Sequence, residues 1–343
     1  MHISELDFDL PAHLIATEPL EERDRSRLLR VNRPSSEYRD TFFCELPDLL
    51  RPSDVLVVNN TKVFPARLLG DSETGASVEI FLVRENEDKS WSALAKPARR
   101  LPPGRSITFG PGLSGSIVQR NDDGQVVISF RSDLPIEEAI ERYGRTPLPP
   151  YIKRDRDAAD TDRERYQTIY ASHGGAIAAP TAGLHFTPHI LEQIRQRGIK
   201  VVEITLHVGY GTFEPVKVED LTEHRVQAEQ YEMSTEAAET LNQAKSEGRR
   251  VIAVGTTTTR TLESVFQQYG EFQTSRGLAG LTIQPGYRFK AIDGLLTNFH
   301  LPKSSLLVLV STFGGHELIM KAYKHAIDSG YRFYSYGDCM LIE

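Results

Sequence analysis

The pattern of apolar and polar positions changes near residue 65 and again near residue 160, and each change predicts a different kind of structure. Before the first change, residues 54–59 are almost continuously apolar, which predicts a buried strand. After Pro65, short β-type runs alternate with turns rich in Gly, Pro, Asn and Asp, without a convincing helix. These runs cover residues 77–84, 90–94, 106–109, 114–119 and 125–130. Together they predict a small antiparallel barrel or sandwich.

Beyond residue 160, predicted strands and helices alternate along the chain. Thr187 and Ser234 are suited to cap two helices, and Gly198 and Gly248 are suited to end them. Further helices are expected over 260–266, 304–313 and 316–329, and strands over 199–206, 250–254, 295–299 and 331–336. This alternation is typical of a layered α/β domain.

The predicted strand at 54–59 is expected to join the sheet of the later region, which makes the β-rich region an insertion. We therefore predict a layered α/β domain with an inserted small antiparallel β-barrel domain. The α/β domain would be discontinuous, with residues 1–64 and 153–343, and the inserted domain would comprise residues 65–152. The proline-rich stretch 144–150 ends the insertion because it does not favour regular structure.

Composition places the chain among folded globular proteins and gives no sign of export. Hydrophobic residues make up 39% of the chain and charged residues 25%. The apolar run 306–310 is far too short to cross a bilayer, and the N-terminus has no apolar signal core. The only two cysteines, Cys44 and Cys339, lie far apart and outside any paired motif. We therefore expect a cytoplasmic protein with no membrane contact and no disulfide.

Four segments of unusual composition lie at predicted strand ends or lead into a predicted helix, which is where open α/β sheets bind ligands. The segments cover residues 178–187, 207–213, 255–260 and 297–300. Their candidate catalytic residues are His185, His207 and His300. Their candidate binding residues are Thr181, Gly183, Gly209, Gly211, Thr212, Thr256, Thr257, Arg260, Asn298 and Phe299. The hydroxyls and the guanidinium at the start of the third segment suit a carboxylate or a phosphate.

Ordinary explanations exist for each of these segments. A lone histidine is usually a structural or surface residue, and the threonine run could be only a helix cap. Three histidines at predicted strand ends favour a shared pocket. Other motifs are incomplete: residues 209–214 lack the third glycine of a dinucleotide fingerprint, and 316–320 lack the second histidine of a zinc protease. We therefore expect no metal site, and the absence of G-x-S-x-G and P-loop motifs gives serine hydrolases and NTPases no support.

Basic residues gather in or beside the predicted insertion, although the formal net charge of the chain is −7. A charge run is usually a solvated face, but a local basic face is enough to hold several phosphates. The best candidates for contacts to a nucleic-acid backbone are Arg99, Arg100, Arg105, Arg145, Lys153 and Arg154. Residues 23–27 (RDRSR) form a further basic, polar segment near the N-terminus.

Several long strings in the chain resemble those of one known family. They include 23–29 (RDRSRLL), 59–68 (NNTKVFPARL), 144–152 (GRTPLPPYI), 178–187 (AAPTAGLHFT), 205–213 (TLHVGYGTF), 254–264 (VGTTTTRTLES), 296–306 (LTNFHLPKSSL) and 332–340 (RFYSYGDCM). The chain is similar, nearly end to end, to the S-adenosylmethionine:tRNA ribosyltransferase-isomerases of queuosine biosynthesis. One departure lies in 224–229 (HRVQAE), where Gln227 replaces an expected histidine while His224 and Glu229 are in place.

The resemblance implies an α/β domain that carries a β-barrel, and an uncommon use of S-adenosylmethionine. The ribosyl part of this donor is transferred to the aminomethyl group of a 7-deazaguanine base at the wobble position of tRNA. Adenine and methionine leave, and an epoxycyclopentanediol, epoxyqueuosine, is formed. The resemblance implies no metal and no cofactor apart from the consumed donor, and we expect the chain to act as a monomer.

The implied reaction assigns roles to the histidines. The sulfonium acidifies the C5′ protons, so a base must remove one, and adenine leaves more easily when an acid protonates it. Histidine can serve in either role near neutral pH. We expect His185 and His300 to supply the base and the acid, in an order that the sequence leaves open. His207 would hold the ribose hydroxyls or orient a partner.

The remaining groups of the two substrates also have candidate partners. We expect Arg260 and the amides of 256–259 to bind the carboxylate of the donor, and Asp338 or Glu229 to bind its ammonium. Tyr287 or Phe299 could stack on adenine or on the deazaguanine. The basic face of the inserted domain is expected to dock the anticodon stem, while the target base reaches the α/β pocket unstacked.

Two other classes of protein stay open on the sequence. A histidine-dependent hydrolase or lyase would account for the histidines, but not for the insertion or the long strings. A non-enzymatic RNA-binding protein would account for the basic clusters, but not for small and hydroxylated residues at several strand ends. An ordinary methyltransferase has less support because no Gly-rich loop follows a first strand with an acidic residue downstream.

Overall fold

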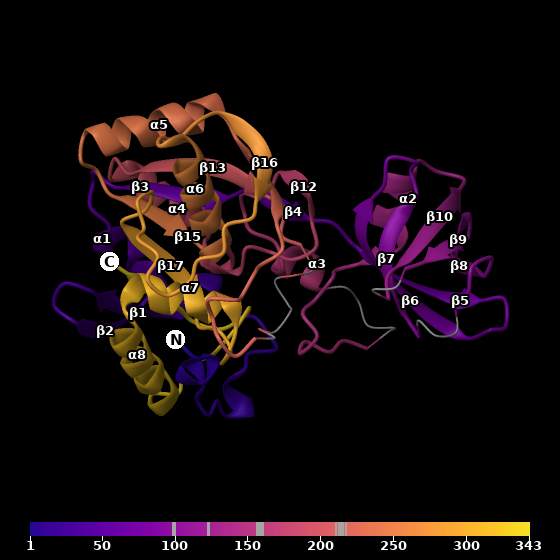
Figure 1. The fold of residues 1–343 in the computed structure, drawn as a ribbon, viewed down its shortest axis with the longest axis horizontal. Coiled ribbons are helices and arrows are strands. Elements are labelled where there is room, and N and C mark those ends of the chain that lie inside the picture. The colour runs from indigo at the N-terminus through magenta and orange to yellow at the C-terminus, as the bar shows by residue number, and fades with distance from the viewer. Residues whose placement is uncertain (98–100, 122–123, 156–160, 210, 212–215, 217) are drawn as a thin grey trace.

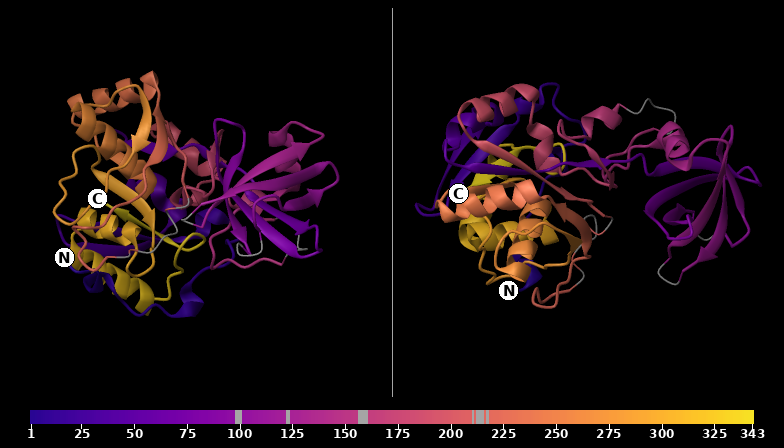
Figure 2. Two further views of the ribbon diagram at one scale, coloured as in Figure 1. Left: turned by 45° about the vertical axis from the view of Figure 1, so that its right-hand side comes forward. Right: turned by 90° about the horizontal axis from the view of Figure 1, so that it is seen from above.

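The protein is built from two large β-sheets, shown in Figure 1 as an α/β body and a separate barrel. The computed structural model describes residues 1–97, 101–121, 124–155, 161–209, 211, 216 and 218–343. Figure 2 shows that the barrel stands to one side of the α/β body, joined to it by extended segments. In these described ranges no helix combines the length and the apolar character needed to cross a membrane.

The larger sheet has nine strands and is mixed. In spatial order the strands are β16 (Ser275–Ala279), β14 (Glu229–Met233), β13 (Lys200–Leu206), β3 (Val55–Asn59), β15 (Val251–Val254), β17 (Gly294–Asn298), β18 (Cys339–Ile342), β1 (Arg27–Asn32) and β2 (Glu37–Phe42). Strand β3 pairs in parallel with β13 and with β15, and β15 pairs in parallel with β17. Strand β18 runs antiparallel to β17 and parallel to β1. The prediction that residues 54–59 join the later strands is therefore confirmed.

Both faces of this sheet are covered, as the continuous apolar runs of its central strands predict. Val55 and Val57 of β3 pack into one core, and Leu56 and Val58 pack into the other. Helices α5 (Thr235–Ser246), α6 (Thr256–Tyr269), α7 (Ser305–Gly314) and α8 (His316–Asp328) contribute to the first core. Helices α1 (Leu46–Leu49) and α4 (Pro188–Gln196) contribute to the second core.

The predicted helix caps are confirmed. The Thr187 hydroxyl accepts the amide hydrogen of Ile190, and the Ser234 hydroxyl accepts that of Ala237. One predicted boundary is wrong, because α6 begins at Thr256 and not near residue 260. The threonine run forms the first turn of the helix, and within it the Thr258 hydroxyl donates to the carbonyl of Val254 at 2.6 Å. The helix therefore starts directly at the end of β15.

The smaller sheet closes into an antiparallel barrel, which confirms the predicted fold class. Its six strands, in spatial order, are β5 (Arg67–Ser72), β6 (Ser77–Glu85), β7 (Trp91–Lys96), β10 (Val126–Ser132), β9 (Leu113–Arg120) and β8 (Ser106–Gly110). Strand β8 pairs back with β5 to close the barrel, and β11 (Gly144–Arg145) adds to β5. The expectation of no helix here is wrong, because α2 (Ile136–Tyr143) packs Ala139 and Ile140 into the barrel core.

Residues 331–336 were predicted as the last long strand, but the last strand is β18. The chain turns here because the Asp338 carboxylate accepts the amide hydrogens of Arg332 at 2.7 Å and Arg27 at 2.9 Å. Tyr334 lies within this turn at a φ of 76°. Several strands were not predicted, among them β1, β2, β5, β14, β16 and β18 itself. The domain boundaries at 64 and 153 stay a prediction.

Short elements connect the two bodies. Strand β4 (Thr61–Val63) pairs in parallel with β12 (His173–Ala176). Elsewhere in the described ranges, short helical elements include α3 (Asp162–Arg165) and the 3-10 helices η1 (Ile3–Leu6), η2 (Ala12–Leu14), η3 (Arg23–Arg25), η4 (Phe43–Glu45) and η6 (Thr181–His185).

Candidate active site

Three adjoining pockets lie at one end of the nine-stranded sheet. Strands β3, β13, β15 and β17 end there, and β1 and β18 begin there, because β18 runs antiparallel to β17 and parallel to β1. The Arg260 pocket and the His300 pocket each enclose about 550 Å³, open solvent at their mouths included. They share Thr256, Thr257 and Leu306, so they adjoin, and together they make up the cleft at this end of the sheet. The Arg23 pocket meets the His300 pocket at Ser335.

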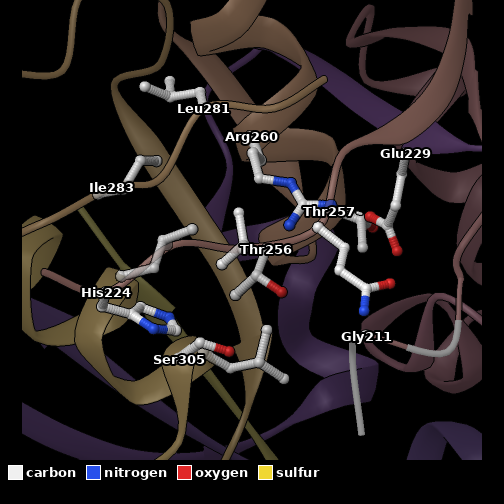
Figure 3. Close-up of a pocket in the computed structure, with 13 residues that line it drawn as sticks. Gly211, His224, Glu229, Thr256, Thr257, Arg260, Leu281, Ile283 and Ser305 are labelled. Atoms are coloured by element: carbon white, nitrogen blue, oxygen red, sulfur yellow. Dashed lines mark ion pairs between the residues drawn. The ribbon is translucent and has the colours of Figure 1, made fainter. Parts of the chain in front are cut away.

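The Arg260 pocket contains a buried pair of opposite charges (Figure 3). Arg260 of α6 forms an ion pair with Glu229 of β14, and their side chains are only 13% and 6% exposed. The second Glu229 oxygen accepts the amide hydrogen of Gly209 at 2.7 Å. Burial lowers the pKa of Arg260 to about 10, so the guanidinium stays charged at neutral pH. Such a pair can bind a zwitterion, with the guanidinium on its carboxylate and the carboxylate on its ammonium.

Several polar atoms that face this cleft lack a partner. Among the residues that the structure describes, Oγ1 of Thr257, Nε2 of His224 and Oδ1 of Asn298 are buried without a hydrogen bond. Thr257 and His224 line the Arg260 pocket, and Asn298 lines the His300 pocket. A buried polar atom without a partner costs roughly 1–3 kcal/mol. These three atoms are available to hydrogen-bond a polar ligand or water in the cleft.

His300 follows β17 and is 4% exposed. Its Nε2 lies 2.9 Å from the hydroxyl oxygen of Thr297, and its backbone amide donates to the hydroxyl of Tyr323 at 2.9 Å. Burial lowers the pKa of His300 to about 3, so the imidazole is neutral at pH 7. The neutral imidazole has a nitrogen lone pair that can accept a proton, and the low pKa makes the imidazolium that would form a strong proton donor.

His185 lies in η6 and is held on both sides of its ring. Its Nδ1 lies 2.7 Å from the Ser26 hydroxyl, and its Nε2 lies 3.2 Å from Nδ2 of Asn298. Nδ2 of Asn298 also faces the carbonyl oxygen of Tyr334 at 3.2 Å, so this atom must be the donating nitrogen of the amide. Nε2 of His185 therefore accepts, and Nδ1 carries the proton. Burial, with a smaller effect of the Arg23 charge, lowers the pKa of His185 to about 4.

His207 lies just beyond β13 and apart from the other two histidines. Its Nδ1 is 2.9 Å from the hydroxyl oxygen of Thr61, and Gly175 packs against its ring at a φ of 142°. Burial lowers the pKa of this half-buried histidine. His207 is not among the described residues that line the three pockets, so its substrate role stays a prediction.

The structure brings together only some of the other candidate binding residues. Thr181 lines the His300 pocket, Gly211 lines the Arg260 pocket, and Gly183 packs against Tyr170 and Thr168. Thr212 lies outside the described residues. No proposed role is tested by these placements.

Three further candidates lie outside the described linings of the pockets. The Asp338 carboxylate is bound to two backbone amides at the turn before β18. The Tyr287 hydroxyl donates to the buried Glu263 carboxylate at 2.9 Å. Phe299 packs fully buried among aromatic rings of the core. Ammonium binding by Asp338 and stacking by Tyr287 or Phe299 stay predictions.

The basic residues predicted to contact a nucleic-acid backbone are mostly engaged with protein groups. Arg105 lies 3.6 Å from Glu73, and Arg154 pairs with Asp162 at 2.7 Å and with Glu18 at 2.9 Å. Arg145 is half-buried and has interactions of its own, and Lys153 is exposed. Arg99 and Arg100 lie outside the described residues.

The structure adds residues that the sequence did not single out for the site. Ser26 holds His185, and Tyr334, Ser335 and Tyr166 line the His300 pocket. Ser26, Tyr334 and Ser335 lie within the strings shared with the family, which is their only signal in the sequence. Across the described ranges, no group of three or more His, Cys, Asp and Glu residues is placed to hold a metal ion.

The fold and the cleft together define an α/β enzyme with a ligand site at the carboxyl ends of its strands, joined to a β-barrel. A family model described as "Queuosine biosynthesis protein" matches residues 3–342, and the chain belongs to this family. The chain is 50% identical to the S-adenosylmethionine:tRNA ribosyltransferase-isomerase of Desulfitobacterium hafniense and 49% identical to that of Desulforamulus reducens, over 100% of each chain. The predicted family and the prediction of a transferase enzyme are confirmed.

A solved structure agrees with this assignment. The crystal structure of an S-adenosylmethionine tRNA ribosyltransferase from Thermotoga maritima matches with a TM-score of 0.56 and 34% sequence identity. The match covers 99% of this chain and 100% of that chain. The predicted fold class is confirmed by this match and by the two sheets described above.

Proposed function

We propose that the chain transfers and isomerises the ribosyl moiety of S-adenosylmethionine onto the 7-aminomethyl-7-deazaguanine wobble base of tRNA. Adenine and methionine are released and epoxyqueuosine is formed. Membership of the family supports this reaction. The observation that carries the proposal is a single cleft with a buried Arg260–Glu229 pair in one part and the neutral imidazole of His300 in the other.

In this proposal, the Arg260 pocket binds the methionine part of the donor. Arg260 donates to the α-carboxylate and Glu229 accepts from the ammonium, so that the ion pair of the free protein is replaced by a matching zwitterion. The pocket wall around this pair includes apolar side chains that suit the methylene groups next to sulfur, namely Leu281, Ile283, Leu306 and Leu309. The sulfonium and the ribose then extend past the shared Thr256 and Thr257 towards His300.

His300 is the base in this proposal. The neutral imidazole takes a proton from C5′, which the adjacent sulfonium has made acidic. The imidazolium that forms can give this proton to a nitrogen of adenine as the bond from C1′ breaks, so that adenine leaves as a neutral molecule. One histidine would then serve the transfers from C5′ and to adenine. The aminomethyl nitrogen gives up a proton to solvent as it bonds to the ribosyl carbon, and methionine leaves as a neutral thioether when the C5′–S bond breaks.

His185 acts through Asn298 in this proposal and is a positioning residue. With both ring nitrogens held by Ser26 and Asn298, the imidazole fixes the direction of the Asn298 amide. Oδ1 of Asn298 is then free, among the described residues, to accept a hydrogen bond from an N–H or O–H group of a substrate.

The target base enters the His300 pocket from a single-stranded anticodon loop, where an unstacked base is accessible. The donor is consumed, and we propose that no metal or further cofactor takes part. Action as a cytoplasmic monomer stays a prediction.

A product analysis tests the proposed reaction. The purified chain is incubated with S-adenosylmethionine and tRNA that carries the aminomethyl base, and small molecules and digested nucleosides are analysed by mass spectrometry. We expect adenine, methionine and epoxyqueuosine in equal amounts, and only when both substrates are present. Formation of S-adenosylhomocysteine, or release of adenine without a modified nucleoside, would overturn the proposal.

A further inference from the structure

The Arg23 pocket is the third pocket at this end of the sheet, and the reaction outlined above does not use it. Its lining combines two arginines with apolar groups and with His185: Pro19, Leu20, Arg23, Ser26, Arg165, Leu184, His185, Ser335, Tyr336 and Gly337. It meets the His300 pocket at Ser335, whereas the Arg260 pocket meets the His300 pocket at Thr256, Thr257 and Leu306. The Arg23 pocket and the Arg260 pocket therefore border different walls of the His300 pocket.

The arginines around the Arg23 pocket are held by carbonyl oxygens. Arg23 donates to the carbonyl of Gln167 at 3.1 Å, and Arg165 donates to the carbonyls of Glu21 at 3.2 Å and of Leu20. Nearby, Arg332 donates to the carbonyl of Glu18. Carbonyl oxygens satisfy N–H groups and fix the direction of a guanidinium, but they do not neutralise its charge.

No carboxylate within the described part of the chain forms an ion pair with Arg23, Arg165 or Arg332. Nη1 of Arg332 is buried without a hydrogen-bond partner among the same residues. Burial and the charge of Arg165 lower the pKa of Arg23, which is the effect of like charges held close together. Arg23 and Arg165 therefore bring positive charge together without an ion-pair partner among the described residues, while Arg332 interacts with the nearby Asp338 charge.

We propose that Arg23 and Arg165 bind a backbone phosphate of the RNA substrate, next to the nucleotide whose base enters the His300 pocket. This inference rests on the proposed function. Guanidinium groups bind phosphate through paired N–H donors, and two of them line one small pocket beside the base site. The donor does not account for this pocket. Its only anionic group is the carboxylate, which binds Arg260 on a different wall of the His300 pocket in the proposed function.

The apolar part of the lining is consistent with a nucleotide and not with a freely hydrated ion. Pro19, Leu20 and Leu184 line the pocket beside the two half-buried guanidinium groups, and partial burial strengthens their attraction for an anion. The shared residue Ser335 places the phosphate and the base on either side of one backbone segment. The phosphate would thereby fix the register of the strand, while the base is recognised in the neighbouring pocket.

Binding of an anticodon stem-loop RNA to matched arginine variants tests the inference. Arg23→Gln and Arg165→Gln each remove one charge from the pocket, and Arg23→Lys retains the charge. The control Arg276→Gln removes the same charge from an exposed ion pair between Arg276 of β16 and Glu232 of β14. Thermal melting of each variant confirms that it is folded.

We expect each pocket variant to bind the RNA roughly tenfold or more weakly, because a charge-assisted hydrogen bond is lost. The slope of log affinity against log salt should fall by about 0.7 for each phosphate contact that is lost. Arg23→Lys should keep most of this slope, and the control should bind like the parent protein. The Michaelis constant for S-adenosylmethionine should be unchanged in all variants.

A second set of RNAs identifies the phosphate. Single methylphosphonate linkages, which are neutral, are placed on either side of the wobble nucleotide. We expect one of these to weaken binding to the parent protein about as much as Arg23→Gln does, and to have no further effect on that variant. Competition with inorganic phosphate should be weak.

Three results would overturn the inference. The pocket variants could bind RNA like Arg276→Gln, or they could raise the Michaelis constant for the donor and leave RNA binding intact. Alternatively, inorganic phosphate could compete strongly while every neutral linkage is tolerated, which would identify a site for free phosphate. Failure of the proposed function is separate, because the parent protein would then bind the RNA but yield no epoxyqueuosine.

Discussion

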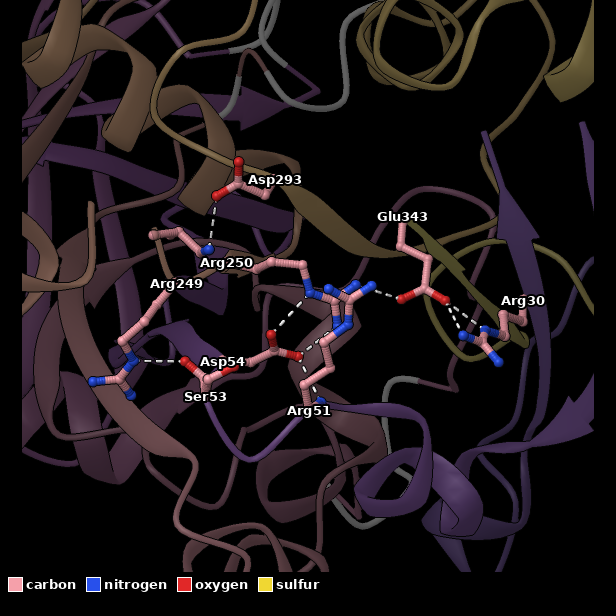
Figure 4. Close-up of polar contacts among 9 residues, drawn as sticks. Arg30, Arg51, Ser53, Asp54, Arg249, Arg250, Asp293 and Glu343 are labelled. Atoms are coloured by element: carbon pink, nitrogen blue, oxygen red, sulfur yellow. Dashed lines mark hydrogen bonds and ion pairs between the residues drawn. The ribbon is translucent and has the colours of Figure 1, made fainter. Parts of the chain in front are cut away.

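Two groups of arginines lie at opposite ends of the same sheet, and they differ in their partners. At the amino end, before β15, Arg250 donates to both oxygens of Asp54 at 2.8 and 2.6 Å and to Glu343 at 2.8 Å (Figure 4). Glu343 also pairs with Arg30. At the carboxyl end, Arg23 and Arg165 have carbonyl partners only, within the described ranges.

The two ends also differ in their electrostatics. The hydrogen bonds and charge of Asp54 raise the pKa of Arg250, whereas burial and the charge of Arg165 lower the pKa of Arg23. Arginine thus pairs with carboxylates and stabilises the fold at the amino end of the sheet. At the carboxyl end it leaves positive charge that a ligand can neutralise. We infer that the amino end serves stability and the carboxyl end serves substrate binding and catalysis.

The largest effect that should distinguish the two ends of the sheet is the loss of activity expected from His300→Gln. Removal of the base should lower turnover by roughly 10²–10⁴-fold, because proton transfer from C5′ then has no positioned acceptor. Binding of the donor should persist, since Arg260 and Glu229 are intact. Single-turnover kinetics and donor titration check this, with His189→Gln on the exposed face of α4 as the control. Turnover within a few-fold of the parent protein would remove His300 from the mechanism.

At the amino end, Arg250→Gln should affect stability and not chemistry. Asp54 is fully buried, so loss of its partner leaves an uncompensated charge and should lower the free energy of unfolding by about 3 kcal/mol. Turnover per folded molecule should be unchanged. Denaturant unfolding measures the first effect, and Arg276→Gln should change the free energy by less than about 1 kcal/mol. A selective loss of activity in a stable Arg250 variant would contradict the division.

The pH dependence of stability should carry a contribution from the carboxyl end. The pKa of His300 is lowered to about 3 in the folded state, while an unfolded histidine titrates near about 6.5. Between these values the unfolded state binds a proton that the folded state does not, so stability falls as the pH falls below about 6.5. By pH 5 the loss due to this residue should be about 2 kcal/mol.

Unfolding experiments at pH 7 and pH 5 check this expectation. The parent protein should lose more stability over this interval than His300→Gln, whatever the difference between the two proteins at pH 7. An equal loss in both proteins would show that His300 is accessible to protons in the folded state.

The smallest of these effects is expected for Arg260→Lys. Lysine keeps the charge opposite Glu229 but loses the paired donors that suit a carboxylate, so the Michaelis constant for the donor should rise by about tenfold. Turnover at saturating donor should change little. Steady-state kinetics with varied donor check this, and an unchanged Michaelis constant would place the carboxylate elsewhere.

The central strands and the helix starts could be predicted from the sequence because local signals encode them. Residues 54–59 are apolar throughout since β3 is buried on both faces, and the hydroxyls of Thr187 and Ser234 reach amides only three residues away. Strand β2 was missed because five of its six residues are exposed, which leaves no alternation to detect. The turn at 331–336 was predicted as a strand because one of the contacts that stabilise it is remote in sequence. Asp338, at the end of the turn, accepts the amide hydrogen of Arg27, which lies 311 residues away.

The candidate site divides in the same way. The small and hydroxylated segments at the strand ends could be recognised locally, and several of them line the cleft. The Arg260–Glu229 pair and the contact of Ser26 with His185 join different elements, so spacing along the chain does not reveal them. The sequence also could not predict that Arg23 lacks a carboxylate partner, because a run of basic residues does not show which of them form ion pairs in the fold.

Hydrogen–deuterium exchange with and without S-adenosylmethionine tests the division between the two ends most directly. We expect slower exchange on donor binding for the amides at the start of α6, at Gly209 and after β17. Amides around Arg250 and in β18 should exchange at the same rate in both states. Protection centred on the amino end, with none at the start of α6 while the donor is bound, would contradict the account.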